Sequence, residues 1–190
     1  YLWWGLLAHL LILAPLPLIH LFNRETWPLE LILAALTTAL AKSVYFLALR
    51  RAYTFAPVAL VYPLARSSPI LIAVWAWLFF GHSLSLMETL AILVSVAGLW
   101  VLALTSRGGD ARHALPWAAL AALSTSVYSL SDKVAADHLT GLVELMGYIS
   151  LGYAASFVSL SLAQWIETGR VVPAIRPSWF HILLGGSCIG

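Results

Sequence analysis

Apolar residues follow one another in long runs along nearly the whole chain, and charged residues occupy short stretches between these runs or isolated positions inside them. Five segments contain no aspartate, glutamate, lysine or arginine: residues 1–23, 67–87, 89–106, 113–131 and 145–166. A helix that crosses a bilayer needs about 20 mostly apolar residues. The pattern therefore predicts an all-α, polytopic membrane protein.

Prolines, glycines and short polar stretches divide the chain into seven hydrophobic elements. These elements are residues 1–22, 28–50, 56–80, 86–104, 114–135, 142–165 and a run that follows residue 178. Pro15 and Pro17 are expected to bend the first element, Pro63 and Pro69 to interrupt the third, and Gly81 to end it. The chain starts and stops inside apolar runs, so we expect it to be truncated at both ends.

Composition supports the membrane assignment and excludes several other classes. Hydrophobic residues make up 62% of the chain and charged residues 9%, whereas soluble domains carry about 25% charged residues. The net charge of +2 is too small to indicate a nucleic-acid partner. The single cysteine, Cys188, excludes an internal disulfide framework, and the six scattered histidines form no metal-ligand pattern. We expect no metal and no cofactor, and the lipid bilayer is the expected surrounding.

Arg66 is the most informative charge, because it lies near the middle of the third element between Pro63 and Pro69. A charge at the centre of a membrane helix costs about 2.5–3.5 kcal/mol. Broken helices at membrane depth occur where the backbone faces protein or a water-filled cavity. Tyr62 lies one turn before Arg66 on the same face. We interpret Arg66 as a cation that faces a cavity and meets an anionic substrate. The alternative is a structural ion pair or a side chain that reaches the membrane surface.

Two further helices carry polar groups inside their apolar runs. Lys42 lies well inside the second element, and Tyr45 points the same way. The fifth element has a polar stripe on one face, formed by Thr125, Tyr128, Ser129 and Asp132. These groups are candidates for lining a cavity. Two alternatives remain open: Lys42 as the partner of a carboxylate on another helix, and Asp132 with Lys133 as ordinary interfacial charge.

A membrane-embedded, lipid-modifying enzyme is the alternative from another functional class. It would need a catalytic pair near one membrane surface, such as His82 with Glu88. Glu88, however, also has capping-box spacing from Ser85 at the start of the fourth element. No nucleophile–base pair or phosphate-binding glycine loop appears in the sequence, so the chain is not expected to be an enzyme. A non-transporting scaffold would tolerate neutralisation of all its buried charges.

Short motifs lie between Arg51 and Leu104 and at the end of the fifth element. They read Ala56-Pro57-Val58, Val61-Tyr62-Pro63-Leu64-Ala65-Arg66, Ser68-Pro69, Phe79-Phe80-Gly81, Ser83-Leu84-Ser85, Ala97-Gly98-Leu99 and Tyr128-Ser129-Leu130-Ser131-Asp132-Lys133. These motifs resemble those of the drug/metabolite transporter superfamily, specifically its EamA-like members.

The resemblance implies a fold of about ten helices in two inverted repeats around a central cavity. This chain would then hold helices two to eight. Residues 1–105 would belong to the first repeat, residues 106–113 to the loop between the repeats, and residues 114–190 to the start of the second. The resemblance also places the cavity at the helices that hold Lys42, Arg66 and Asp132.

The function that follows is the export or import of a small organic solute by alternating access. The expected substrate pathway consists of Lys42, Tyr45, Tyr62, Arg66, Tyr128 and Asp132. Cations in this set favour an amino-acid-like or other anionic or zwitterionic metabolite, and multidrug-type efflux of cationic compounds is the alternative. We expect the bacterial cytoplasmic (inner) membrane as the location, and a homodimer is compatible with the sequence.

Two features depart from the family pattern. His82 stands where family members often carry glutamate. The second departure is membrane orientation. Charge asymmetry assigns one side of the membrane Arg50, Arg51, Arg107, Arg112, Arg170 and Arg176, and the other side Arg24 and Lys133. This count places the arginine-rich loops in the cytoplasm, whereas the family usually has both termini there. We favour the family orientation.

Overall fold

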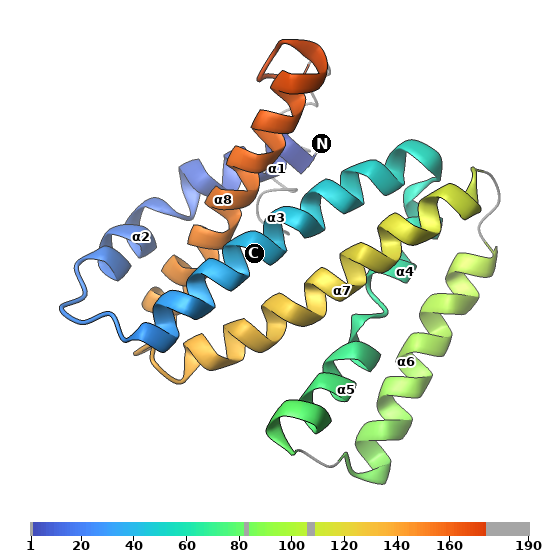
Figure 1. The fold of residues 1–190 in the computed structure, drawn as a ribbon, viewed down its shortest axis with the longest axis horizontal. Coiled ribbons are helices and arrows are strands. Elements are labelled where there is room, and N and C mark those ends of the chain that lie inside the picture. The colour runs from blue at the N-terminus through green and yellow to red at the C-terminus, as the bar shows by residue number, and fades with distance from the viewer. Residues whose placement is uncertain (1, 82–83, 106–108, 174–190) are drawn as a thin grey trace. The chain divides into compact units, whose positions relative to one another are not determined.

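The computed structural model describes residues 2–81, 84–105 and 109–173, and every regular element in this part of the chain is an α-helix (Figure 1). The helices are α1 (Leu2–Ile12), α2 (Pro15–Phe22), α3 (Leu29–Phe55), α4 (Val58–Ala65), α5 (Ser68–Phe80), α6 (Leu86–Thr105), α7 (Ala111–Ala136) and α8 (Leu142–Thr168). The all-α prediction is confirmed. The hydrophobic run expected after residue 178 lies outside the described residues.

The first hydrophobic element is broken more sharply than a proline bend, since the axes of α1 and α2 differ by 62°. The carbonyl of His9 accepts bonds from the amides of Leu13 (2.9 Å) and Ala14 (3.1 Å), which end α1. Pro15 and Pro17 then occupy the first turn of α2, where a missing amide proton costs little. The same prolines that end one helix therefore start the next.

The third predicted element is also two helices, α4 and α5. Arg66 ends α4, its amide bonding to the carbonyl of Tyr62 (3.0 Å), and Ser67 separates it from α5. Pro63 lies inside α4, and Pro69 lies in the first turn of α5. Gly81 follows α5 with a φ of 61°, the left-handed conformation that glycine adopts readily at a helix end. The predicted end at Gly81 is confirmed.

Three stretches are long and apolar enough to cross a bilayer: Leu29–Phe55, Val58–Phe79 and Leu142–Thr168. The bent pair α1–α2 passes the same test as a fourth span. Helix α7, which carries charges near both ends, is not among the spans found in the described residues. Large apolar side chains such as Leu16 and Met87, each 78% exposed, suit contact with lipid. The protein is a multi-pass integral membrane protein.

The described chain forms two compact units, which divide within α3 and within α7 and not at a loop. Unit 1 contains the described residues up to Phe46 and those from Ser131 onward, and unit 2 contains Leu47–Leu130. This grouping follows contacts in space and does not test the expected repeat boundaries, which stay predictions.

In unit 1, α1 and α2 pack against α8 (Figure 1). The core of this unit consists of Leu21, Leu31, Ala34, Ala35, Ala135 and Tyr148. A β-carbon at Gly147 would collide with the carbonyl oxygen of Pro17 and lie 2.9 Å from the β-carbon of Leu21. Glycine therefore lets α2 and α8 approach closely, as small residues do at membrane helix contacts.

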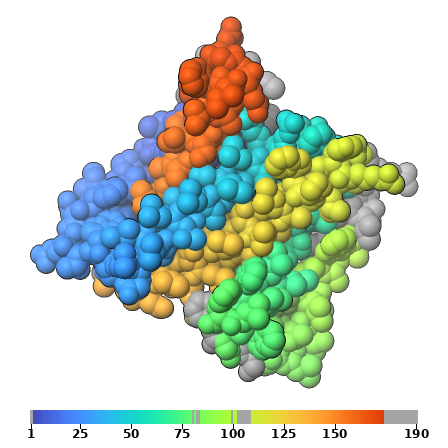
Figure 2. Space-filling model, viewed as in Figure 1, coloured from blue at the N-terminus to red at the C-terminus, as the bar shows by residue number. Residues whose placement is uncertain are grey.

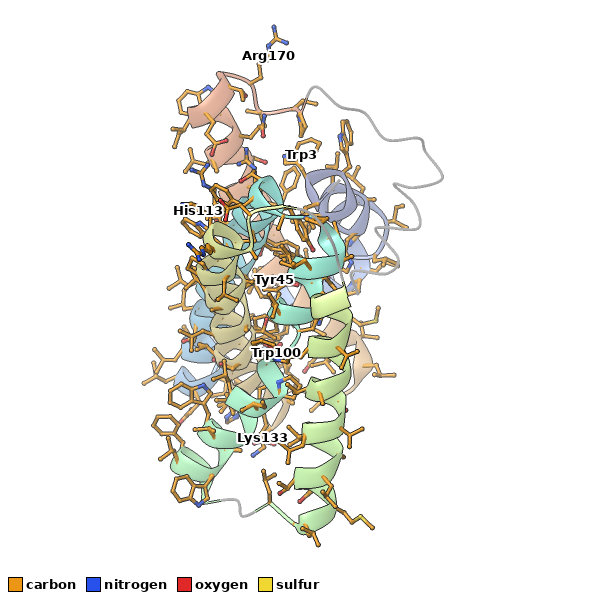
Figure 3. The ribbon with its side chains drawn as sticks, turned by 90° about the vertical axis from the view of Figure 1, so that its right-hand side faces the viewer. Trp3, Tyr45, Trp100, His113, Lys133 and Arg170 are labelled. Carbon is orange, nitrogen blue, oxygen red and sulfur yellow. The ribbon has the colours of Figure 1, made fainter. Side chains whose placement is uncertain are left out.

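The C-terminal end of α8 extends beyond this packed region. Its last turns, red in Figure 2, carry exposed apolar side chains such as Trp165 and Ile166, the latter 71% exposed. Arg170 follows the helix at its outer end (Figure 3). An apolar helix end followed by arginine is typical of a membrane boundary, because the charged group reaches the aqueous surface.

In unit 2, α4 and α5 pack against α6. Helix α6 opens with the predicted capping box: the amide of Ser85 donates to Oε2 of Glu88 (2.8 Å), and the amide of Glu88 donates to Oγ of Ser85 (3.3 Å).

Two hydrogen bonds connect α7 with other helices of unit 2. Trp75 on α5 donates its indole N–H to Oγ of Ser126 on α7 at 3.0 Å. The start of α7 is joined to the end of α3, since the amide of Asp110 bonds to the carbonyl of Phe55 at 2.7 Å.

Candidate functional site

A buried polar cluster lies in unit 1 where α3, α7 and α8 meet. We call Thr38, Lys42, Asp132 and Tyr148 the Lys42 cluster. Nζ of Lys42 lies 3.5 Å from Oδ2 of Asp132, and the hydroxyl of Thr38 donates to Oδ1 of the same carboxylate at 2.8 Å. Each carboxylate oxygen therefore has its own partner from α3.

The fourth member extends this arrangement into α8. The phenolic oxygen of Tyr148 lies 2.8 Å from Oγ1 of Thr38. A threonine hydroxyl has a single proton, and here that proton is directed at Asp132. Tyr148 must therefore donate to Thr38, which gives a chain of hydrogen bonds that runs from Tyr148 through Thr38 to Asp132. Thr38 and Tyr148 are each 1% exposed, so this chain is buried.

Helical spacing places these side chains together. Thr38 and Lys42 lie one turn apart on one face of α3, and Tyr148 and Gly152 lie one turn apart on α8. Lys42 passes α8 at Gly152, and its Nζ lies 5.1 Å from the centroid of the Tyr153 ring. An ammonium over an aromatic face is attracted by the ring quadrupole. The packing thus holds Lys42 between a carboxylate and an aromatic ring.

The two charges of the cluster differ in exposure. The side chain of Lys42 is 5% exposed, whereas the side chain of Asp132 is 25% exposed. Taking an ammonium out of water is costly unless a counter-ion and hydrogen bonds compensate. Asp132 supplies that counter-ion and is the more exposed member of the pair.

A second buried contact lies beside the cluster on α8. Nε2 of His9 on α1 lies 3.1 Å from Oγ of Ser150, and the His9 ring meets the Tyr153 ring edge-on at 4.8 Å. His9 is 4% exposed and Ser150 is 1% exposed. The buried face of α8 therefore carries polar groups from Tyr148 to Tyr153, in a helix that is otherwise largely apolar.

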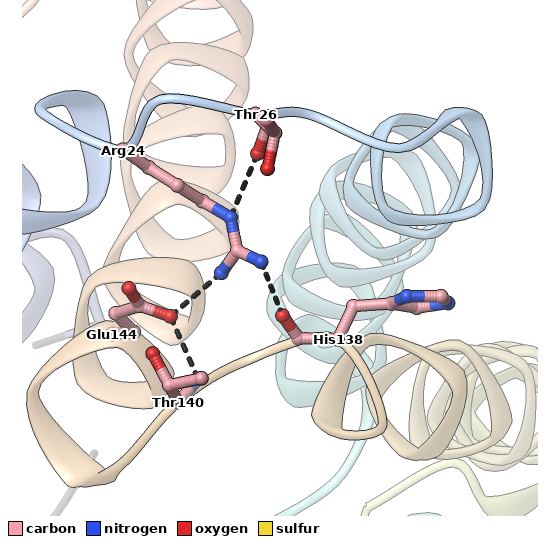
Figure 4. A network of polar contacts seen from close by, with 5 residues as sticks. All are labelled: Arg24, Thr26, His138, Thr140 and Glu144. Carbon is pink, nitrogen blue, oxygen red and sulfur yellow. Dashed lines mark hydrogen bonds and ion pairs between the residues drawn. The ribbon is translucent and has the colours of Figure 1, made fainter.

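A separate network joins two loops at the ends of helices in the same unit (Figure 4). The Arg24 guanidinium contacts Oε2 of Glu144 at 2.6 Å and donates to the carbonyls of His138 (2.5 Å) and Thr26 (2.8 Å). The amide of Thr140 donates to the same Glu144 oxygen at 2.7 Å. Glu144 lies in the first turn of α8, where the helix dipole favours an acidic group. This geometry fits a structural tie between the loops that precede α3 and α8.

Unit 2 holds the other charged candidate of the predicted pathway. Arg66 is exposed at the end of α4, where its Nε donates to the hydroxyl of Tyr62 at 3.1 Å. The guanidinium carbon also lies 5.2 Å from the Tyr62 ring centroid. The cation therefore lies at a helix C-terminus, which the macrodipole makes favourable, and it bonds to the tyrosine that shares its face.

The structure brings together some of the predicted pathway residues. Lys42 contacts Asp132, and Tyr62 contacts Arg66. Tyr45 is buried at 7% exposure on α3, and Tyr128 is half-buried on α7 in unit 2. The alternative interpretation of Lys42, as the partner of a carboxylate on another helix, matches the contact seen. That contact does not test whether a solute passes along these residues, so the pathway remains a prediction.

Sequence reasoning missed the two hydroxyl groups of the cluster. Thr38 lies one turn before Lys42, so its position on the same face of α3 could have indicated it. Tyr148 gave no comparable signal, because the sequence does not show which face of α8 meets α3. His82, the candidate member of an enzymatic pair, lies outside the described residues. Its proposed partner Glu88 bonds within the capping box.

Comparisons with known proteins connect this chain with membrane transporters. A model described as the EamA-like transporter family matches residues 1–104. The chain is also 30% identical over 101 residues to the "Uncharacterized transporter YvbV" of Bacillus subtilis (strain 168), a match that covers 53% of this chain and 32% of that protein. The matching part of this chain therefore spans about a third of the length of that relative. No solved structure matches.

Proposed function

The chain belongs to the EamA-like transporter family, and on that premise we propose that the protein is a secondary transporter, which moves a small organic solute across a bilayer by alternating access. The relative from Bacillus subtilis is itself named a transporter. We place the protein in the bacterial cytoplasmic membrane. The solute class that we favour carries a carboxylate and is an amino-acid-like or other anionic or zwitterionic metabolite.

The buried ammonium of Lys42 is the observation that carries this proposal. It lies in α3, the longest of the apolar spans together with α8, and is only 4% exposed. Ionisable groups inside membrane helices are costly, and they commonly mark solute or ion pathways. Lys42 already pairs with a carboxylate at 3.5 Å. The same ammonium can pair with the carboxylate of a solute of similar chemistry.

Arg66 supplies a second cation for this solute class. Its guanidinium presents several N–H donors in a planar fork that matches a carboxylate. Tyr62 holds the Nε edge of this group at 3.1 Å. Arg66 also ends α4 beside the break in the Val58–Phe79 span, and broken spans occur where the backbone lines a cavity or packs within protein.

Uptake assays with the full-length protein in proteoliposomes test the proposal. The solutes are a panel of radiolabelled dicarboxylates, amino acids and lipophilic cations, and the variants are Lys42→Met and Arg66→Ala. We expect uptake of at least one carboxylate-bearing solute by the wild type, and a loss of tenfold or more in each variant. Unchanged uptake of every carboxylate-bearing solute by both variants contradicts the proposed pathway.

Arg51→Ala provides a matched control for Arg66→Ala. Arg51 is also exposed, and its guanidinium carbon lies 5.5 Å from the ring of Phe55, one turn away. It therefore shares the local packing of Arg66 but is not among the residues assigned to the pathway, so Arg51→Ala should transport normally. Uptake confined to lipophilic cations would instead support multidrug-type efflux. A protein that moves none of these solutes while tolerating both variants would fit a scaffold.

A further inference from the structure

We propose that a groove between α5 and α6 binds one acyl chain of a membrane glycerolipid, and that the indole of Trp77 donates a hydrogen bond to the ester carbonyl of that lipid. The groove lies in unit 2 and contains none of the residues assigned to the substrate pathway. The inference therefore concerns a lipid site and goes beyond the proposed function.

The groove is elongated and has a volume of about 290 Å³. It lies between two helices that run side by side (Figure 1). Its α5 wall consists of Ile70, Ala73, Val74 and Trp77, whose spacing places them on one face of the helix. From Ile70 to Trp77 this wall extends over about 10 Å at the helical rise of 1.5 Å per residue. The small side chain of Ala73 gives the groove its depth near the middle.

The walls of the groove select an apolar ligand. Thr89, Ile92 and Leu93 form the α6 wall. The hydroxyl of Thr89 donates to the carbonyl of Ser85 at 3.0 Å, so its proton is already used within the protein. A polar solute would lose its hydrogen bonds to water on entering this groove and would regain few of them, which is costly. An apolar chain meets no such cost.

The position and size of the groove favour an acyl chain as this ligand. Helix α5 belongs to the membrane-spanning stretch Val58–Phe79. Val74, Trp77 and Leu93 on the two walls are 45%, 62% and 54% exposed, and exposed apolar side chains of a spanning stretch suit contact with lipid. A helix is about 10–12 Å across, so it is too wide to lie inside a groove of about 290 Å³. A single acyl chain is narrow enough to do so.

Packing and one hydrogen bond supply the driving force. An empty groove forfeits the dispersion contacts of its lining atoms, and a flexible acyl chain restores them. The hydrophobic effect adds nothing, because the surrounding lipid tails are as apolar as the walls. A polar contact is therefore needed to hold one lipid in preference to its neighbours.

Trp77 can supply this polar contact. It lies three residues before Phe80, which ends α5, and close to the end of the Val58–Phe79 span. Its indole N–H makes no hydrogen bond to another residue in the part of the chain that the structure describes. Tryptophan is enriched at the boundary between membrane and water, where the ester groups of glycerolipids also lie. An ester carbonyl accepts the hydrogen bond that the indole offers.

Photolabelling of the full-length protein in phosphatidylcholine vesicles tests the inference. The probe is a phosphatidylcholine with a diazirine on one ester-linked acyl chain, and mass spectrometry maps the adducts. The reference is the apolar surface of α2 at Leu16 and Ile19, which are 78% and 58% exposed. We expect about threefold more adducts on the groove walls than on this surface, the factor that corresponds to one membrane hydrogen bond of about 0.6 kcal/mol. An ether-linked probe with the same photoreactive chain lacks the carbonyl and should lose this enrichment.

Two variants separate the shape of the groove from its surroundings. Ala73→Phe fills the groove and should reduce the adducts on its walls to the level of the α2 surface. Ala91→Phe makes the same change at an exposed position of α6 that does not line the groove, and it should label like the wild type.

Three results overturn the inference and leave the proposed function untouched, because none of them involves solute uptake. One is equal labelling of the groove walls and the α2 surface, which is expected if another helix of the full-length protein or a second copy covers the groove. Another is enrichment that persists in Ala73→Phe. The third is equal enrichment with the ester-linked and ether-linked probes, which contradicts the bond from Trp77. The comparison of the two probes uses the wild type alone, so it remains decisive if a variant does not fold.

Discussion

Gly152 on α8 lies directly against the side chain of Lys42 on α3. A β-carbon at position 152 would lie 2.7 Å from Cδ of Lys42 and 3.2 Å from Cγ2 of Thr38. A side chain at position 152 would therefore require the side chains of Lys42 and Thr38 to move. The position of the buried ammonium therefore depends on a residue that carries no functional group.

Gly152→Ala should consequently destabilise the protein even though alanine favours a helix. The added methyl displaces Lys42, and overpacking of this kind costs about 1–3 kcal/mol. Gly98→Ala on α6 is the control, because a β-carbon there meets no atom within 4 Å and should gain up to about 1 kcal/mol of helix propensity. Unfolding of both variants in detergent measures the difference. Equal stability of the two variants contradicts the close contact.

Removing one charge of the buried pair Lys42–Asp132 should lower the free energy of unfolding more than removing both. Lys42→Met leaves the Asp132 carboxylate without its ammonium, and breaking a buried pair in this way costs about 3–5 kcal/mol. The double variant Lys42→Met, Asp132→Leu replaces the pair with apolar groups and should be more stable than the sum of the single effects implies. A double-mutant cycle on unfolding free energies checks this, and strict additivity would count against a direct interaction.

The hydrogen bonds from Tyr148 through Thr38 to Asp132 predict that substitutions at Tyr148 and Thr38 lower the stability by different amounts. Tyr148→Phe removes one hydrogen bond, at a cost of about 0.6 kcal/mol, the average for a bond between membrane helices. Thr38→Val removes the bonds to both Tyr148 and Asp132 and should cost more. Thr37→Val is the matched control, since the hydroxyl of Thr37 is exposed and bonds only within its own helix, to the carbonyl of Leu33. Thermal unfolding of the three variants gives the order.

The Arg24 network predicts that lysine cannot replace arginine at this position. Arg24 makes contacts from three nitrogens to Glu144, His138 and Thr26, and a lysine ammonium cannot reproduce this planar arrangement. Arg24→Lys should lower stability by about 1.5–3 kcal/mol, the range for hydrogen bonds to charged groups. Arg170→Lys, at an exposed position after α8, should have little effect. Similar unfolding midpoints for the two variants would show that the network is not a stabilising tie.

The hydrogen bond between His113 and Asp110 at the start of α7 should make the stability of the protein depend on pH. The side-chain hydrogen bond from His113, 2.6 Å in length, lowers the pKa of the Asp110 carboxyl below its ordinary value of 3.8. A group whose pKa is lowered by folding contributes stability that is fully present above the ordinary pKa and is lost as the pH falls through the folded one. The unfolding temperature of the wild type should therefore decrease as the pH is lowered from 5 to 3, and that of Asp110→Asn should decrease less steeply. Identical pH profiles for the two proteins contradict this contribution.

Several elements of the fold were predictable because they depend on local chemistry. Pro15 and Pro17 cannot donate backbone hydrogen bonds inside a helix, and the chain breaks there. Ser85 and Glu88 close a helix turn through contacts three residues apart. The candidate site was predictable only in part. Lys42 and Asp132 stood out as charges inside apolar runs, but their mutual contact and the bonds through Thr38 and Tyr148 join residues that are distant in sequence.

The amino-acid sequence alone was enough to identify a multi-pass, all-α membrane protein with a few costly charges in its apolar helices. Hydrophobic length and the backbone limits of proline and glycine act locally, so a single chain displays them directly. The contact of Lys42 with Asp132 and its packing against Gly152 on α8 became evident from the folded structure. These contacts depend on which faces of α3, α7 and α8 meet, and lipid-exposed and buried faces of a membrane helix are equally apolar, so hydrophobic periodicity does not distinguish them.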